Sequence, residues 1–134
     1  MAYADSSLLL KLYLLEPETP AALAALSSFA GSVIFTPLHR LEIVNAIRRK
    51  QALKALQTLR ADLCSGFYLQ PPLDWAKVFQ RSHRLSRKHA NKLLVRSLDL
   101  LHVALALELG TSEFLTFDDR QRQAASAEGF KVIL

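Results

Sequence analysis

The chain has 134 residues and a formal net charge of +5. Hydrophobic residues make up 51% of it and charged residues 22%. This length and composition predict one folded domain spanning residues 1–134 and exclude a disordered chain. Its single cysteine, Cys64, excludes an intrachain disulfide and a cysteine-based zinc cluster, which suits the cytoplasm. The amino terminus lacks a basic region before an apolar core, and the longest apolar run, Leu98–Leu109, is too short to span a bilayer, so we expect a soluble chain with no secretory signal and no membrane partner.

The first part of the chain predicts two strands and two helices. Residues 2–4 are apolar and predict a buried strand, after which Asp5-Ser6-Ser7 caps a helix that the leucine spacing extends to Leu15. A second helix is expected at residues 21–29. The β-branched and aromatic residues 32–35 then predict the second strand.

Two amphipathic helices are expected next, at residues 36–50 and 51–63. The first of them starts at Thr36-Pro37 and is expected to turn these apolar side chains inward: Leu41, Ile43, Val44 and Ile47. The leucines of residues 51–63 form an apolar face that fits either the core or a dimer contact.

The second half of the chain alternates in the same way. Residues 97–110 contain almost only leucine, valine and alanine, so this helix is expected to be buried on all sides, and residues 90–96 before it are expected to be irregular. The remaining strands are expected at residues 67–69, 113–117 and 130–134, and the remaining helices at 74–89 and 119–128. This alternation predicts a single three-layer α/β/α domain with a mostly parallel sheet of about five strands.

Positive charge is concentrated between Trp75 and Leu98, where seven basic side chains and no acidic one occur. Such clusters bind phosphate backbones, although a solvated helix face has the same pattern. The RNA-binding candidates in this stretch are Arg84, Arg87, Lys88 and Arg96. This distribution favours a nucleic-acid partner.

Four acids recur close to strand ends: Asp5, Glu42, Asp99 and Asp118. Ligands of open parallel sheets gather at the carboxyl ends of strands, so these acids are expected to meet in one cleft. Four carboxylates repel one another unless a cation lies between them, and an all-oxygen ligand set favours Mg²⁺ or Mn²⁺. Such a cation clamps a phosphodiester and activates water. Taken singly, each acid is better explained by a structural role: Asp5 and Asp99 as helix caps, Asp118 as a turn residue and Glu42 as a solvated helix acid. These roles do not predict that all four meet at one end of the sheet.

The sequence around these acids resembles PIN-domain proteins, specifically the VapC-like toxin ribonucleases of bacterial and archaeal toxin–antitoxin pairs. The resemblance covers essentially the whole chain, and four segments carry it: Tyr3–Leu8, Thr36–Ala46, Arg96–Ala104 and Leu115–Arg120. It implies a five-stranded parallel sheet, a Mg²⁺- or Mn²⁺-dependent endoribonuclease, frequent homodimers, and an antitoxin whose carboxyl-terminal tail blocks the acidic cleft.

The resemblance also implies a role for each acid. Asp5, Asp99 and Asp118 match the metal-binding aspartates, and Glu42 matches the acid that helps to position metal or water. Asp118 fits the Thr-X-Asp pattern of the family better than its neighbour Asp119 does. All four acids are expected to be catalytic.

Two other functions fit parts of the sequence. A non-catalytic RNA- or partner-binding module can have the same fold, but phosphate binding alone would gain nothing from four acids. A phosphoacceptor receiver domain requires paired acids near the amino terminus and an acid after the third strand, which this chain lacks. The sequence does not identify the RNA, because such recognition depends on cleft shape and single-stranded features.

Overall fold

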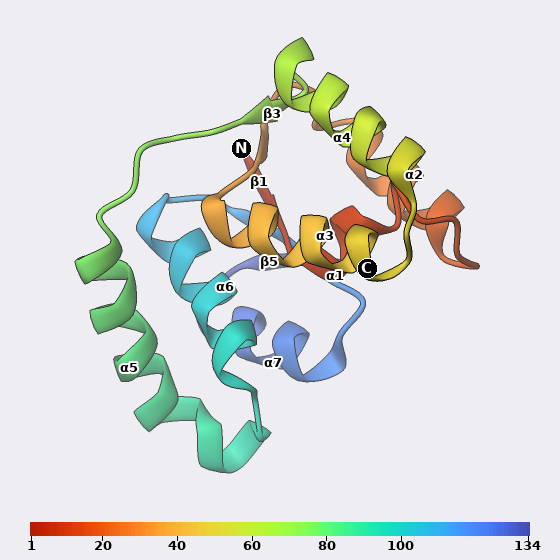
Figure 1. The fold of residues 1–134 in the computed structure, drawn as a ribbon. Coiled ribbons are helices and arrows are strands. Elements are labelled where there is room, and N and C mark those ends of the chain that lie inside the picture. Colours follow the sequence, from red (N-terminus) through yellow and green to blue (C-terminus); the bar gives the residue numbers. More distant parts are fainter. The chain divides into compact units, whose positions relative to one another are not determined.

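A computed structural model describes residues 1–134, and its strands and helices alternate along the chain (Figure 1). The strands are β1 (Ala2–Ala4), β2 (Val33–Ile34), β3 (Tyr68–Leu69), β4 (Glu113–Leu115) and β5 (Lys131–Ile133). The helices are α1 (Ser6–Leu10), α2 (Thr19–Ser27), α3 (Pro37–Arg49), α4 (Leu53–Ser65), α5 (Trp75–Leu93), α6 (Ser97–Glu108) and α7 (Asp119–Ala127). The sheet has five strands in the order β3-β2-β1-β4-β5. The predicted α/β fold class is therefore confirmed.

The chain comprises two compact units, of which the first is Met1–Pro71. In this unit β1 pairs with β2 and β2 pairs with β3, both in parallel, with Ala2 opposite Val33 and Val33 opposite Tyr68. Every residue of β1 is fully buried, as its apolar sequence predicts. Helix α1 packs against α3, and α3 packs against α4. The core of this unit therefore forms around the strand that leads into Asp5.

The first helix is shorter than the leucine spacing predicts. It ends at Leu10, and most of the next amides bond to the third residue back, such as Tyr13 N–H to the Leu10 carbonyl at 3.0 Å. The Lys11 carbonyl accepts the hydroxyl of Thr19 at 2.8 Å instead of a helical amide. Leu15, predicted to lie on the apolar side of this helix, is 91% exposed. A side-chain hydroxyl therefore competes with the helix here and ends it early.

The inward face of α3 is narrower than predicted. Ile43 and Ile47 are buried and Val44 is half-buried, but Leu41 is 69% exposed. The predicted apolar face of α3 is therefore buried only in part. At 3.6 residues per turn, Leu41 lies at the edge of the face that packs against the core. On α4, only Leu59 is fully buried, while Leu53 is exposed.

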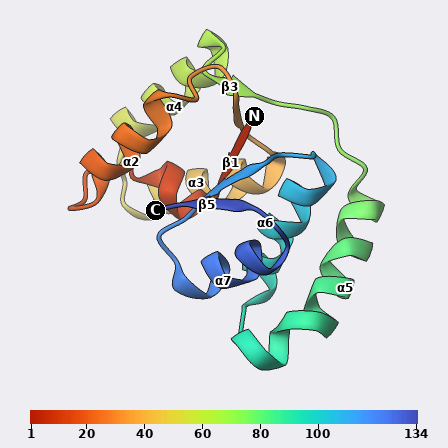
Figure 2. The same cartoon turned by 180° about the vertical axis from the view of Figure 1, so that it is seen from behind.

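The second unit is Pro72–Leu134, in which β4 and β5 pair in parallel with Phe114 opposite Val132. Helix α6 is buried from Leu100 to Ala106, as its uniformly apolar sequence predicts. The amphipathic helix α5 packs along α6, and α7 packs against both α6 and β5 (Figure 2). No helix of the chain combines the length and the apolar character that crossing a membrane requires.

Helix α5 is longer than predicted, because it continues through the stretch expected to be irregular. It begins at Asp74, whose carboxylate accepts the Lys77 amide at 3.2 Å as predicted, and it continues to Leu93. Leu94 then ends it with a left-handed backbone (φ 53°). Near this end Lys88 and the buried His89 both bond Glu128 beyond α7, at 2.7 and 2.8 Å. These contacts hold the last turns of α5 in helical form.

Candidate active site

Asp5 follows β1 directly and caps α1. Its carboxylate accepts the backbone N–H of Leu8 at 2.8 Å and the hydroxyl of Ser7 at 3.1 Å, and the residue is only 4% exposed. An aspartate at this position satisfies an amide that the first helical turn leaves unpaired. A carboxylate has two oxygens and about four lone-pair sites, so capping leaves acceptor capacity for a further ligand. The cap and the predicted metal ligand are compatible roles of the same side chain.

Glu42 lies on the second turn of α3 and is linked to the segment that carries Asp5. The hydroxyl of Ser6, the residue after Asp5, donates to Glu42 Oε1 at 2.9 Å. Asp5 itself is the helix cap, so neither Ser6 nor Ser7 has the capping role that their position after the strand suggested. Each serine instead supports one carboxylate: Ser6 supports Glu42, and Ser7 supports Asp5.

His39 connects α3 to the end of β1, a role that the sequence analysis missed. Its Nδ1 accepts the Thr36 amide at 2.9 Å, so the proton lies on Nε2, which donates to the Ala4 carbonyl at 2.7 Å. Thr36 and His39 form a capping box at the start of α3, with His39 in the position where glutamate or glutamine is usual. The three-residue spacing from Thr36 was the signal available in the sequence. A fully buried histidine thus holds the backbone immediately before Asp5.

The buried phenol of Tyr3 is affected by the negative charges of Asp5 and Glu42. Burial raises the pKa of its phenol well above the ordinary value, and the negative charges of Asp5 and Glu42 raise it further, while a hydrogen bond from Thr36 opposes them. The phenol is therefore neutral at physiological pH. The negative charges of Asp5 and Glu42 thus act on the fully buried Tyr3 side chain. A cation bound between such carboxylates would reduce this negative potential.

In the second unit, Asp118 caps α7 much as Asp5 caps α1. Its carboxylate accepts the Gln121 amide at 2.8 Å, and its own amide donates to Thr116 Oγ1 at 3.0 Å. Asp119, the alternative candidate, points elsewhere: its side chain is 82% exposed and pairs with Arg122 at 2.7 Å. The geometry around the fourth strand therefore gives Asp118, and not Asp119, the position equivalent to Asp5.

Asp99 is half-buried in the first turn of α6, and Gln121 connects it to the Asp118 turn. The buried Gln121 side chain accepts Thr116 Oγ1 at 2.9 Å and donates to the backbone carbonyl of Asp99 at 3.3 Å. The N-cap position of α6 belongs to Arg96, so Asp99 is not the N-cap residue of this helix. Its place in the first turn fits an acid at the positive end of the helix dipole.

The structure brings the predicted acids together in two pairs, one within each unit. Asp5 and Glu42 are linked through Ser6, and Asp99 and Asp118 are linked through the Gln121 side chain and backbone. Neither unit by itself gathers three or more His, Cys, Asp or Glu side chains in a metal-binding arrangement.

The basic candidates on and after α5 differ in their surroundings. Arg84, Arg87 and Arg96 are exposed, whereas Lys88 is already paired with Glu128. Burial acts to raise the pKa of Glu128, but the hydrogen bonds from Lys88 and His89 outweigh it and hold that pKa below its ordinary value. The predicted RNA-binding surface is therefore carried mainly by the arginines.

Comparison with known proteins identifies the family of this arrangement. The family model described as PIN domain matches residues 2–127. The chain belongs to the PIN-domain family. PIN domains are generally nucleases, so the acids of this PIN domain lie in a fold whose general activity is cleavage of nucleic acid. The resemblance inferred from the four sequence segments is confirmed at the level of the family.

A solved structure supports the same fold. The crystal structure of FitAcB from Neisseria gonorrhoeae resembles this PIN domain with a TM-score of 0.70. The likeness covers 100% of this chain and 97% of that one at 17% sequence identity. At this identity the likeness concerns the fold alone. No curated protein matches the chain.

Proposed function

We propose that this PIN domain is a metal-dependent endoribonuclease and the toxin of a toxin–antitoxin pair. The observation that carries the proposal is the PIN-domain match over residues 2–127, because it includes all four predicted acids. The finer assignment rests on the resemblance to VapC-like toxins in the segments around those acids. An antitoxin partner, a homodimer and a cytoplasmic location are parts of the same proposal.

In this proposal Asp5, Asp99 and Asp118 hold Mg²⁺ or Mn²⁺, and Glu42 orients the attacking water. The donor set fits such an ion, since it consists of carboxylate oxygens without thiol or imidazole ligands. Burial is the main cause of the raised pKa of the Tyr3 phenol, and the negative charges of Asp5 and Glu42 add to it. A cation held by these acids would neutralise that negative charge.

The chain's own residues prepare the site before any substrate arrives. Ser7 and the α1 amide of Leu8 fix the rotamer of Asp5, and Ser6 fixes that of Glu42. Gln121 holds the Asp99 backbone near the Asp118 turn. A divalent cation held by Asp5, Asp99 and Asp118 would supply a Lewis acid that polarises a phosphodiester and lowers the pKa of water. Positioned carboxylates of this kind avoid reorganisation during the reaction.

Metal dependence is the direct test. The purified chain should cut total cellular RNA into discrete products with Mg²⁺ or Mn²⁺, and excess EDTA should abolish cleavage. Adding Mn²⁺ beyond the EDTA should restore the same products. RNA binding without cleavage under any metal would favour the non-catalytic binding module instead, and cleavage that persists in EDTA would remove the metal from the mechanism.

The basic helix should contribute affinity for RNA rather than catalysis. Replacing Arg84 and Arg87 together by glutamine should weaken binding of single-stranded RNA and reduce the slope of log K against log salt by about 1.4, since each phosphate contact contributes roughly 0.7. Lys88→Gln should change the slope less, because Lys88 already pairs with Glu128. Filter binding over a salt series measures both. An unchanged slope in the double variant would assign these arginines to another partner.

A further inference from the structure

The second unit has an open groove between α5 and α6, with a volume of about 420 Å³. Its buried part is apolar and consists of Val95, Leu100 and Leu101. Two further apolar side chains line the groove and are accessible: Phe79 of α5 is 51% exposed, and Leu98 of α6 is 49% exposed. The groove therefore offers an accessible phenyl ring beside an apolar floor.

Polar groups without partners line the same groove. His83, Ser86 and Ser97 are exposed, and none of their side chains forms a hydrogen bond or an ion pair within the chain. Ser82 also lines the groove, but its hydroxyl donates to the Val78 carbonyl of its own helix at 2.9 Å. A neutral imidazole and a hydroxyl can each donate and accept a hydrogen bond. The three unpaired groups can thus recognise a ligand that has both donors and acceptors.

The charge beside the groove is positive. No acidic side chain lines it. Residues four apart on a helix are neighbours, so Arg87 lies beside His83 on α5, and Arg96 directly precedes Ser97. Both arginines are exposed, and neither forms an ion pair within the chain. A ligand with negative charge next to an apolar, flat ring would match this combination.

We propose that the groove between α5 and α6 binds an unpaired base of the RNA substrate. The phenyl ring of Phe79 stacks on the base, and the three unpaired polar groups hydrogen-bond to its edge. Arg87 and Arg96 attract the adjoining phosphates. The inference rests on the proposed endoribonuclease function and adds to it a site for one base.

The groove adjoins the proposed metal ligand Asp99. Ser97 and Leu98 line the groove, and Asp99 is the next residue of α6. A base held there belongs to a nucleotide close to the phosphodiester that this acid would help to bind. Bases inside a double helix are stacked and paired, so only a single-stranded segment can insert one. The groove would therefore select single-stranded RNA and influence where the strand is cut.

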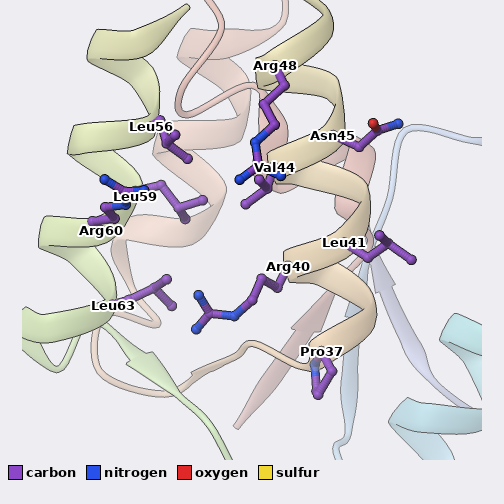
Figure 3. A pocket seen from close by; sticks show the side chains of 10 residues that line it. All are labelled: Pro37, Arg40, Leu41, Val44, Asn45, Arg48, Leu56, Leu59, Arg60 and Leu63. Atoms are coloured by element: carbon purple, nitrogen blue, oxygen red, sulfur yellow. The ribbon is translucent and has the colours of Figure 1, made fainter.

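Two alternatives fit less well. The hollow between α3 and α4 in the first unit is lined by arginines and leucines but by no aromatic side chain on which a base could stack (Figure 3). A second copy of the chain seated on the α5–α6 groove about a two-fold axis would bring the two basic α5 helices together, and like charges across an interface are unfavourable. The phenyl ring and the positive charge together favour RNA in the groove between α5 and α6.

Binding of a short RNA in EDTA tests this site without cleavage. The probe is a single-stranded oligouridine of about nine nucleotides that carries one fluorescent purine, 2-aminopurine, at its centre. Stacking quenches the emission of this purine, and the anisotropy of a dye at the end of the probe gives the affinity. We expect Phe79→Ala to weaken binding about tenfold and to abolish the quenching, whereas Phe79→Tyr should behave like the unsubstituted chain. A hairpin with the same purine paired in its stem should bind more weakly and show no quenching by the protein.

Salt dependence separates stacking from charge. Phe79→Ala should lower the affinity at every salt concentration but leave the slope of log K against log salt unchanged, because a phenyl ring neutralises no phosphate. His83→Ala should weaken binding about threefold through a lost hydrogen bond. Leu23→Ala is the matched control: Leu23 is 53% exposed on α2, outside the groove, and should change the affinity less than about twofold.

Several results would overturn the proposal. They are unchanged affinity in Phe79→Ala, absence of quenching on binding, and equal binding of the hairpin. Sedimentation showing a dimer that Phe79→Ala dissociates would assign the groove to a second copy instead. Binding is measured in EDTA, so a chain that binds as expected but never cuts RNA contradicts the nuclease proposal alone. A chain that cuts RNA but binds it equally well without the phenyl ring contradicts the base site alone.

Discussion

Asp5→Asn should reduce RNA cleavage at least about 100-fold while leaving the fold intact. Loss of a group that only supports a metal ligand costs about 10–100-fold, and here the proposed ligand itself loses its charge. Asparagine caps helices as well as aspartate does, so the bond from the Leu8 amide can be kept. Removing one charge beside Glu42 also lowers repulsion in the metal-free protein. Initial rates of cleavage, Mn²⁺ binding by calorimetry and circular dichroism measure the three effects.

Asp74→Asn is the matched control, because it makes the same substitution at another helix cap. Asp74 caps α5 through the Lys77 amide and is exposed. This variant should cut RNA at the unsubstituted rate, and its free energy of unfolding should change by less than about 0.5 kcal/mol. If Asp5→Asn retained cleavage, or lost it together with its circular dichroism signal, the assignment of Asp5 as a metal ligand would have no support.

The parts of the fold that the sequence predicts well are those decided by local chemistry. The apolar run after Arg96 has no polar face, so its helix had to be buried, and α6 is. Asp74 followed by an amphipathic stretch predicted a capped helix start, and the bond to the Lys77 amide confirms it. The cap bond lies within one turn, where sequence spacing and spatial distance agree, and a helix that is apolar on every side must be buried whichever elements cover it.

The predictions that failed depended on contacts that spacing does not encode. Leucine periodicity extended α1 to Leu15, but the Thr19 hydroxyl takes the Lys11 carbonyl and turns the chain away. The same pattern placed Leu41 inside, whereas its side chain is 69% exposed. A sequence pattern gives the apolar face of a helix, but the partner across from that face decides how much of it is buried.

In the candidate site, too, the features that depend on local sequence were predicted and those that depend on distant contacts were not. The ends of predicted strands indicated Asp5 and Asp118, and each is the N-cap of the helix that follows: Asp5 directly after β1, and Asp118 three residues after the end of β4. The side chains that orient the acids, Ser6 and Gln121, were not recognised, because each acts on a residue distant in sequence: 36 residues separate Ser6 from Glu42. His39 was not predicted to take part in the site, although its buried hydrogen bonds make it part of the site's support.

His39→Ala should lower the free energy of unfolding by about 3 kcal/mol, the largest effect on stability that we expect from a single substitution at this site. The alanine would leave the Thr36 amide and the Ala4 carbonyl without their imidazole partners in a buried region, and each such loss costs about 1–3 kcal/mol. A cavity beside Tyr3 and Phe35, whose rings lie 5.0 and 5.6 Å from the imidazole, adds to this cost. Urea unfolding followed by circular dichroism measures the change.

His39→Gln separates the two functions of the imidazole. Glutamine is a usual third-position residue of a capping box, so it can accept the Thr36 amide and keep the start of α3, while the bond to the Ala4 carbonyl is lost. We expect this variant to lose roughly half of what alanine loses, and hydrogen exchange should be faster in the segment that carries Asp5 but not in α3. His83→Ala, at an exposed histidine of α5, should change stability by less than about 0.5 kcal/mol. Equal losses in the glutamine and alanine variants, with uniform exchange, would mean that His39 only fills space and does not anchor β1 to α3.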